Sequence, residues 1–311
     1  MDALHHEGCF VLCEQALDKA LNVSLNTGIA YAVMAAGTGR NHVTTAWSAE
    51  AVAKYSGMNW RRAKEAIEKL RSVRLITRVE GSRARPRYRL RKPRKQLWIP
   101  TTFIVGARGE TPPIARVRQM QDTKTAFLAL ALYGEQNLIE HGGISRNLIW
   151  REYERDHLMS WAECELYGFT CPDGMTCMPG RGPIPSEDPW DHLRPLIDVG
   201  IIELVPYLSE GDEGELIHAL AGDAIAAEVG SELAGFTEEV QTRYARGDDC
   251  DWIIPVRRHM ASVTMIDVAR MRYRPPKTRM TRIWRSNHVA QLESYLKFYE
   301  AKNAAMTGVA A

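Results

Sequence analysis

Positively charged side chains gather in one short stretch of this 311-residue chain, between Arg61 and Lys95. The stretch holds fifteen lysines and arginines against three glutamates, a net charge of +12, whereas the whole protein carries only +2. Guanidinium and ammonium groups bind phosphate, and gathering them on one surface raises the local affinity for a polyanion. The pattern therefore predicts a nucleic-acid-binding surface, with a solvated charged face as the alternative.

Two helices are expected to precede and support this stretch. The mostly apolar segment 25–36 is followed by a glycine turn at 37–39, which is typical of a helix end. A second helix is expected to begin after Ser48, a favourable N-cap residue, and to end at Gly57. A tight turn would then lead into the charged stretch.

A third helix, capped by Asn59, would carry the first part of the positive charge. Its sequence contains one apolar stripe at helical spacing, formed by Ala63, Ala66, Ile67 and Leu70. With that stripe buried, Arg61, Arg62 and Lys64 would face water or a partner close to the helix N-terminus.

A hairpin is expected after the third helix, because two β-prone runs flank the turn Gly81-Ser82. In the second run, Tyr88 and Leu90 alternate with arginines. Since side chains alternate between the two faces of a strand, this spacing predicts one face lined by Arg85, Arg87, Arg89 and Arg91.

Three helices followed by a basic hairpin resemble the winged helix-turn-helix DNA-binding domain. The matching text is SAEAVAKYSGMNWRRAKEAIEKLRSVRLI with the hairpin after it, inside residues 25–92. The resemblance implies that residues 59–71 read the major groove and that residues 78–91 form the wing. It covers less than a quarter of the chain.

The physical fit to duplex DNA is independent of that resemblance. An α-helix enters the major groove, arginine can bond bidentately to guanine, and wing arginines suit phosphates or a narrow minor groove. The predicted DNA-binding residues are Asn59, Trp60, Arg61, Arg62 and Lys64 in the helix, and Arg83, Arg85, Arg87, Arg89 and Arg91 in the wing. RNA is the rival ligand, but few aromatic side chains accompany the arginines.

The remainder of the chain is expected to divide after this first domain, residues 1–92. Residues 93–113 contain four prolines and predict a linker that docks on a domain, and residues 114–220 repeat the order of helices and hairpin. That repeat predicts a second winged-helix-like domain with an acidic wing tip. Residues 221–311 combine strands, a basic segment and a terminal helix over 289–306. The predicted fold class is mainly α with small β-hairpins, an α+β protein.

One helix of the second domain is expected over 146–158, capped by Ser145. A zinc site can be drawn in the same region, but the spacing of its candidate ligands is not that of a zinc knuckle. Those candidates are His157, Cys164, Cys171, Asp173 and Cys177. Free or buried thiols are favoured, so we expect no metal.

A second possible cluster lies at the N-terminus, in residues 5–13. Cys9 and Cys13 are one helical turn apart there, which favours packing of an N-terminal helix over metal binding. No catalytic signature is found in the sequence, so we expect no enzyme and no cofactor. The sequence has neither a membrane-spanning run nor a signal segment, which predicts a cytoplasmic, nucleoid-associated protein that does not bind membranes.

These features favour a sequence-specific regulator of transcription that binds double-stranded DNA as a homodimer. The dimer is inferred from the general habit of helix-turn-helix proteins. One alternative is a plasmid or phage replication initiator, since such proteins resemble this chain in joining two winged helices. Another is a non-enzymatic adaptor whose basic block binds an acidic protein or RNA.

Overall fold

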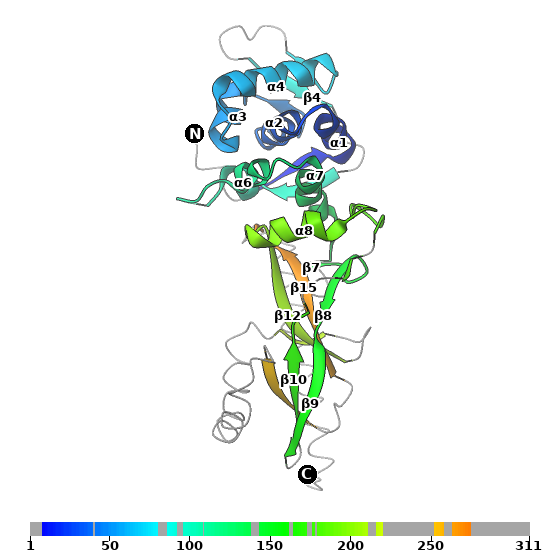
Figure 1. The fold of residues 1–311 in the computed structure, drawn as a ribbon. Helices are drawn as coiled ribbons and strands as arrows, with labels where there is room; N and C mark the ends of the chain where they lie inside the picture. Colours follow the sequence, from blue (N-terminus) through cyan, green and yellow to red (C-terminus); the bar gives the residue numbers. More distant parts are fainter. Residues whose placement is uncertain are drawn as a thin grey trace. The chain divides into compact units, whose positions relative to one another are not determined.

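The computed structural model shows a mixed α and β protein with several small sheets (Figure 1). The residues that it describes are 8–39, 41–79, 86–91, 96–107, 109–137, 143–161, 164–172, 176–177, 179–210, 216–219, 252–257 and 263–274. The chain forms two compact units. Unit 1 comprises Met1–Gln136, Pro179–Glu203 and Met271–Arg282, and unit 2 comprises Asn137–Met178, Leu204–Arg270 and Ile283–Ala311.

Unit 1 is built around one buried helix, α2 (Leu25–Ala36), against which α1, α3, α4 and strand β1 pack. Ten of its twelve residues are buried, and Ser24 caps it by accepting a hydrogen bond from the Thr27 amide. The helices that surround it are α1 (Glu14–Val23), α3 (Ala49–Ser56), α4 (Trp60–Ser72), α5 (Thr102–Val105), α6 (Pro113–Gln119), α7 (Thr123–Ala131), the 3₁₀ helix η1 (Leu132–Glu135) and α8 (Pro189–Asp198). The predicted helix over 25–36 is confirmed.

Two small antiparallel sheets complete unit 1. The first has the order β2-β4-β3, with strands β2 (Thr44–Thr45), β3 (Ile76–Arg78) and β4 (Tyr88–Leu90). The second pairs β1 (Cys9–Cys13) with β5 (Gln96–Pro100), so part of the predicted linker 93–113 is an ordered strand. Along the chain, α2, β2, α3, α4, β3 and β4 therefore form three helices and a three-stranded sheet.

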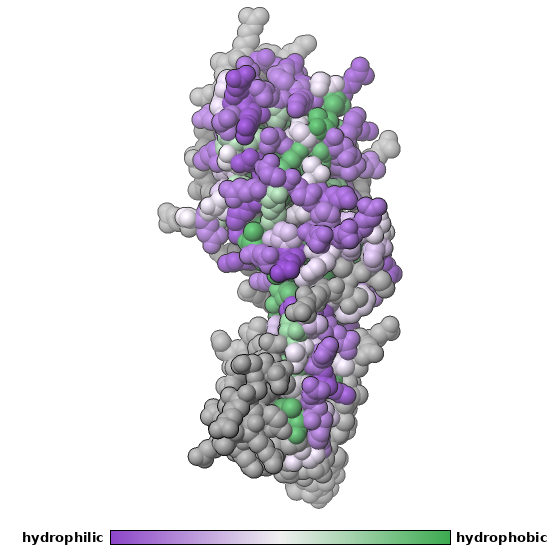
Figure 2. All heavy atoms as spheres, viewed as in Figure 1, coloured by the Kyte–Doolittle hydropathy of each residue, from purple (hydrophilic) through white to green (hydrophobic). Residues whose placement is uncertain are grey.

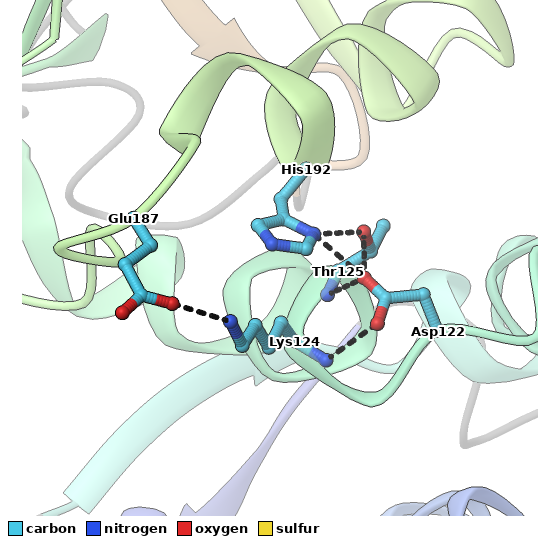
Figure 3. A network of polar contacts seen from close by, with 5 residues as sticks. All are labelled: Asp122, Lys124, Thr125, Glu187 and His192. Carbon is cyan, nitrogen blue, oxygen red and sulfur yellow. Dashed lines mark hydrogen bonds and ion pairs between the residues drawn. The ribbon is translucent and has the colours of Figure 1, made fainter.

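Helices α7 and α8 of unit 1 are joined by a polar network (Figure 3). Asp122 caps α7, because its carboxylate accepts hydrogen bonds from the amides of Lys124 and Thr125. The same carboxylate lies 2.7 Å from Nδ1 of His192 in α8. The Lys124 ammonium nitrogen lies 3.9 Å from a carboxylate oxygen of Glu187, just before α8. These contacts fix the start of α7 against α8.

Unit 2 consists mainly of β-strands. Its two larger sheets have the orders β14-β10-β9 and β11-β8-β15-β12-β13. The strands are β8 (Ile149–Glu152), β9 (Glu154–Trp161), β10 (Cys164–Thr170), β11 (Thr176–Cys177), β12 (Ile202–Glu210), β13 (Leu216–Ala219), β14 (Trp252–Arg257) and β15 (Val263–Met271); the short pair β6 (Gln136–Asn137) and β7 (Gly143–Ile144) forms a further sheet. Unit 1 contributes the first two residues of β12 and the last residue of β15.

An ion pair between a buried carboxylate and a half-buried guanidinium, called the buried pair below, lies in the five-stranded sheet. Arg151 of β8 and Asp267 of β15 are cross-strand partners, and Nε of Arg151 lies 2.6 Å from the Asp267 carboxylate. The Tyr153 hydroxyl donates to the same carboxylate at 3.2 Å. Burial raises the pKa of Asp267, outweighing the opposite effect of the Arg151 guanidinium and the Tyr153 hydroxyl.

Two predicted helices are wrong. Ser145 begins only a single turn, in which its carbonyl accepts from the amides of Leu148 and Ile149, and the chain then continues as β8 and β9. Pairing with neighbouring strands overrides the apparent helical pattern there. Cys9 and Cys13 lie at the two ends of strand β1 rather than on a helix, because this short apolar segment pairs with β5 along its whole length.

The compact units also differ from the predicted division into 1–92, 93–113, 114–220 and 221–311. Helices α6, α7 and α8 belong to unit 1, since α6 contacts α2, α3 and α5 and α7 contacts α1. Most of the predicted second hairpin, 204–210 and 216–219, belongs to unit 2. Strands predicted in the C-terminal region are confirmed as β14 and β15, while its terminal helix lies outside the described residues.

Candidate nucleic-acid interface

Helix α4 exposes the first group of predicted contacts. Asn59 is its N-cap, and the Asn59 side chain accepts a 2.8 Å hydrogen bond from the Arg62 amide. The predicted apolar stripe is buried, and it comprises Ala63, Ala66, Ile67 and Leu70. All five predicted contacts of this segment, from Asn59 to Lys64, are exposed. In the view of Figure 2, the surface over α3 and α4 is mostly hydrophilic.

The exposed side chains of α4 differ in how they are held. The Arg61 side chain is 89% exposed, and its Nε lies 3.3 Å from the Glu65 carboxylate one turn later. Lys64 places its ammonium group 5.3 Å from the ring centre of Trp60, which is itself 58% exposed. The Arg62 guanidinium has no ion pair or hydrogen bond within the described residues. This part of the helix can therefore offer hydrogen-bond donors to an incoming ligand.

The turn between α3 and α4 is fixed from outside the three-helix segment. Gly57 adopts the left-handed conformation at φ 68°, which favours glycine because it has no Cβ. Arg118 of α6 donates to the carbonyls of Ser56 and Gly57, at 2.7 and 3.2 Å. These carbonyls lie at the C-terminal end of α3, so Arg118, a residue distant in the sequence, caps that helix. The two hydrogen bonds also hold the turn that leads into α4. Nothing in the local sequence signals this contact between distant residues.

Strand β4 exposes the second group of predicted contacts. Tyr88 and Leu90 are buried, whereas Arg87, Arg89 and Arg91 are exposed, so the predicted alternation is confirmed for these five residues. Burial raises the pKa of Tyr88, and the nearby guanidiniums of Arg78 and Arg71 oppose that rise. Tyr88 is therefore a neutral core residue under the sheet rather than part of the charged face.

Two of the predicted wing residues, Arg83 and Arg85, lie outside the described residues. Of the hairpin, the described part comprises β3, β4 and the residues next to them, in which Arg78 of β3 is also exposed. The structure thus brings the arginines of β4 and the N-terminus of α4 into one compact unit. Arg78 is an exposed cation of this unit that the predicted contacts did not include. It pairs with Tyr88 across the sheet, so it belongs to the face opposite to Arg89.

Of the candidate zinc ligands, the structure describes the side chains of His157 and Cys171, and among all described residues no group of three or more potential metal ligands is found. His157 instead contacts Glu165 at 2.6 Å, and Ser160 donates to the same carboxylate. Asp173 and the side chains of Cys164 and Cys177 lie outside the described residues. Among the described helices, none is long and apolar enough to cross a membrane.

Comparisons with protein-family models, with curated proteins and with solved structures were made for the whole chain. None of the three found a match.

Proposed function

We propose that this protein binds double-stranded DNA in a sequence-dependent manner, through a winged helix-turn-helix formed by α2, β2, α3, α4, β3 and β4. The observation that carries the proposal is the pair of cationic elements in unit 1. The start of α4 exposes Arg61, Arg62 and Lys64. Arg89 of β4 and the two arginines that flank this strand, Arg87 and Arg91, are also exposed. An exposed helix with a hydrogen-bonding N-terminal turn fits the major groove.

The two elements would have different roles in DNA binding. Side chains at the start of α4 can reach base edges, whose hydrogen-bonding groups differ between base pairs in the major groove. Arginines on β4 suit phosphates, which fix the position of the protein without reading sequence. Transcription regulation is the biological role that such binding supports best.

The proposal predicts a large loss of affinity when α4 loses its N-terminal arginines. Binding of the whole chain to fluorescein-labelled duplex DNA is measured by anisotropy at several salt concentrations. Arg61→Ala with Arg62→Ala is expected to weaken binding at least tenfold, since two charge-assisted contacts to DNA are lost. Affinity of the native protein is expected to fall steeply as salt rises, because bound phosphates release counterions.

The matched control removes two other exposed cations of unit 1, Lys19 in α1 and Arg194 in α8. Lys19→Ala with Arg194→Ala lowers the net charge by the same amount but leaves α4 intact. We expect this control to bind almost as the native protein does. Equal losses in the two double variants would contradict groove reading by α4 and would favour diffuse charge attraction.

The same binding assay distinguishes the biological alternatives. A two-fold symmetric site bound by two chains supports a dimeric regulator, whereas tandem direct repeats with duplex opening support a replication initiator. An affinity for duplex DNA that is insensitive to salt and to Arg61 would overturn the proposal in favour of an adaptor that binds protein.

A further inference from the structure

The outermost face of α4 carries carboxylates as well as arginines. Residues that face directly away from the buried stripe follow a spacing of four, three and four, and they are Arg61, Glu65, Glu68 and Ser72. All four are exposed. A face that only bound phosphate would exclude these glutamates, because each one repels the DNA backbone.

Glu65 lies next to a residue of opposite charge, Arg61. Its carboxylate, with the side chain 59% exposed, lies 3.3 Å from Nε of Arg61. The pair thus presents guanidinium donors and a carboxylate acceptor side by side, within the first two turns of the helix. Each group retains hydrogen-bonding capacity beyond the contact that joins them, since a guanidinium has five N–H donors and a carboxylate accepts several bonds.

This arrangement matches one base-pair edge. In the major groove a G·C pair offers two neighbouring acceptors, N7 and O6 of guanine, followed by the N4 amino donor of cytosine. An A·T pair alternates acceptor, donor and acceptor, so adjacent donors of Arg61 would meet an amino group there. The order of donors and acceptor along the Arg61–Glu65 pair therefore complements G·C.

We propose that Glu65 is a specificity-determining residue that accepts a hydrogen bond from cytosine N4 while Arg61 donates to the guanine of the same pair. This inference rests on the DNA-binding function proposed above and names the base pair that the site selects. Away from such a pair the Glu65 carboxylate repels the backbone, which lowers binding to other sequences. The glutamate thus converts a phosphate-binding surface into a selective one.

The experiment selects bound duplexes from a randomised pool with three forms of the whole chain: native, Glu65→Gln and Glu50→Gln. Glu50 is an exposed acid in the first turn of α3 and serves as the matched control, because its replacement removes the same charge from the same unit. Affinities are then measured for duplexes that carry G·C or A·T at each enriched position. Glu65→Gln is expected to reduce the preference for G·C at one position by about tenfold, and Glu50→Gln is expected to leave it unchanged.

Modified DNA provides a second readout. N4-methylcytosine at the same position replaces the hydrogen that points into the major groove by a methyl group. We expect this base to weaken binding of the native chain more than that of Glu65→Gln, because the amide oxygen of glutamine is a weaker acceptor of that hydrogen than a carboxylate.

The outcomes separate the inference from the function on which it rests. If the native chain selects a motif that Glu65→Gln retains with an unchanged G·C preference, the inference is overturned and DNA binding stands. If the native chain enriches no motif, both are overturned. An ordinary surface ion pair on a solvated helix face would give the first of these results.

Discussion

The two units contain arginine–carboxylate pairs in opposite surroundings. In unit 1, Arg61 and Glu65 are 89% and 59% exposed on α4, whereas in unit 2 Arg151 and Asp267 are 18% and 1% exposed within a sheet. An exposed pair is solvated whether or not it forms, so it contributes little to stability and its groups remain accessible. In the second pair the carboxylate is buried and the guanidinium is half-buried, so removing one charge leaves the other poorly solvated and without its partner. The same chemistry can therefore serve recognition in one unit and structure in the other.

The buried pair is further constrained by its neighbours. The Tyr153 hydroxyl donates to Asp267, and the Arg151 guanidinium lies 5.7 Å from the ring centre of Tyr153. Burial raises the pKa of Tyr153, with the Asp267 charge acting in the same direction, so the phenol stays protonated and remains a donor. The side chains of Arg151, Tyr153 and Asp267 therefore form one polar cluster. Removing any of the three leaves another polar group of the cluster without its partner.

Removing the buried acid should give the largest effect on stability. Asp267→Ala is expected to lower the free energy of unfolding of unit 2 by about 3 kcal/mol, the lower end of the range for a buried pair, because the Arg151 guanidinium, which is 18% exposed, would lose its counter-charge. Urea unfolding followed by tryptophan fluorescence and by hydrogen exchange in β8 and β15 measures this change. A reduction below about 1 kcal/mol, the range of exposed pairs, would break the comparison between the two units.

A double variant distinguishes the effect of an unpaired charge from the effect of altered packing. Asp267→Leu combined with Arg151→Met replaces both charges by apolar side chains, so no unpaired charge remains. Such replacements are often neutral or stabilising. We therefore expect the double variant to be more stable than Asp267→Ala, and a double variant that is equally unstable would show that packing rather than charge carries the effect.

The cap of α7 should have an intermediate effect. Asp122→Ala is expected to destabilise unit 1 by about 1 kcal/mol, the usual cost of losing an N-cap, and it also removes the partner of His192. Asp122→Asn is the matched control, because asparagine caps helices well but carries no charge. Thermal unfolding of the variants measures both changes, and an Asp122→Ala protein as stable as the native one would contradict the role of the network in Figure 3.

The pH dependence of this cap has a definite sign. Burial of Asp122 raises its pKa, but the hydrogen bonds from Thr125 and Lys124 and the nearby His192 outweigh burial, and the net pKa is lowered. A carboxyl whose pKa is lower in the folded state stabilises the fold above its unfolded pKa, near 4. That contribution is lost as the pH falls through the lowered value. The stability difference between the native protein and Asp122→Asn should therefore shrink on acidification below about pH 4.

The local elements of α2 and α4 were predictable from sequence because their signals are local. Asn59 is a strong N-cap residue, and the spacing from Ala63 to Leu70 defines one face of a helix without reference to any other element. The alternation of Tyr88 and Leu90 with arginines likewise needs only the period of a strand. For the same reason, the exposure of the arginines next to Tyr88 and Leu90 and of Arg61, Arg62 and Lys64 could be predicted. Their contact with DNA stays a prediction.

Features that depend on distant partners were not predictable. The strand around Ile149 is stabilised by pairing with β15, more than one hundred residues later, and its sequence alone is compatible with a helix. Arg118 caps α3 although it lies 62 residues after Ser56, and no local motif marks it. The buried pair of Arg151 and Asp267 belongs to the same class, because neither residue signals burial by its type.

The exposed pair should have the smallest effect on stability and so gives the sharpest form of the comparison. Breaking it by Glu65→Gln is expected to change the free energy of unfolding of unit 1 by at most about 0.5 kcal/mol, the usual contribution of such a pair in a helix, and less in high salt. Chemical unfolding of the native protein, Glu65→Gln and Glu50→Gln at low and high salt measures the difference. A loss of several kcal/mol would mean that Arg61 and Glu65 are structural, as Arg151 and Asp267 are, and that the altered DNA preference expected of Glu65→Gln reflects damage to α4. If Glu65→Gln changes the free energy of unfolding negligibly but alters the preference for G·C, the Glu65 carboxylate serves recognition alone. Stability and base discrimination would then depend on different carboxylates of the chain.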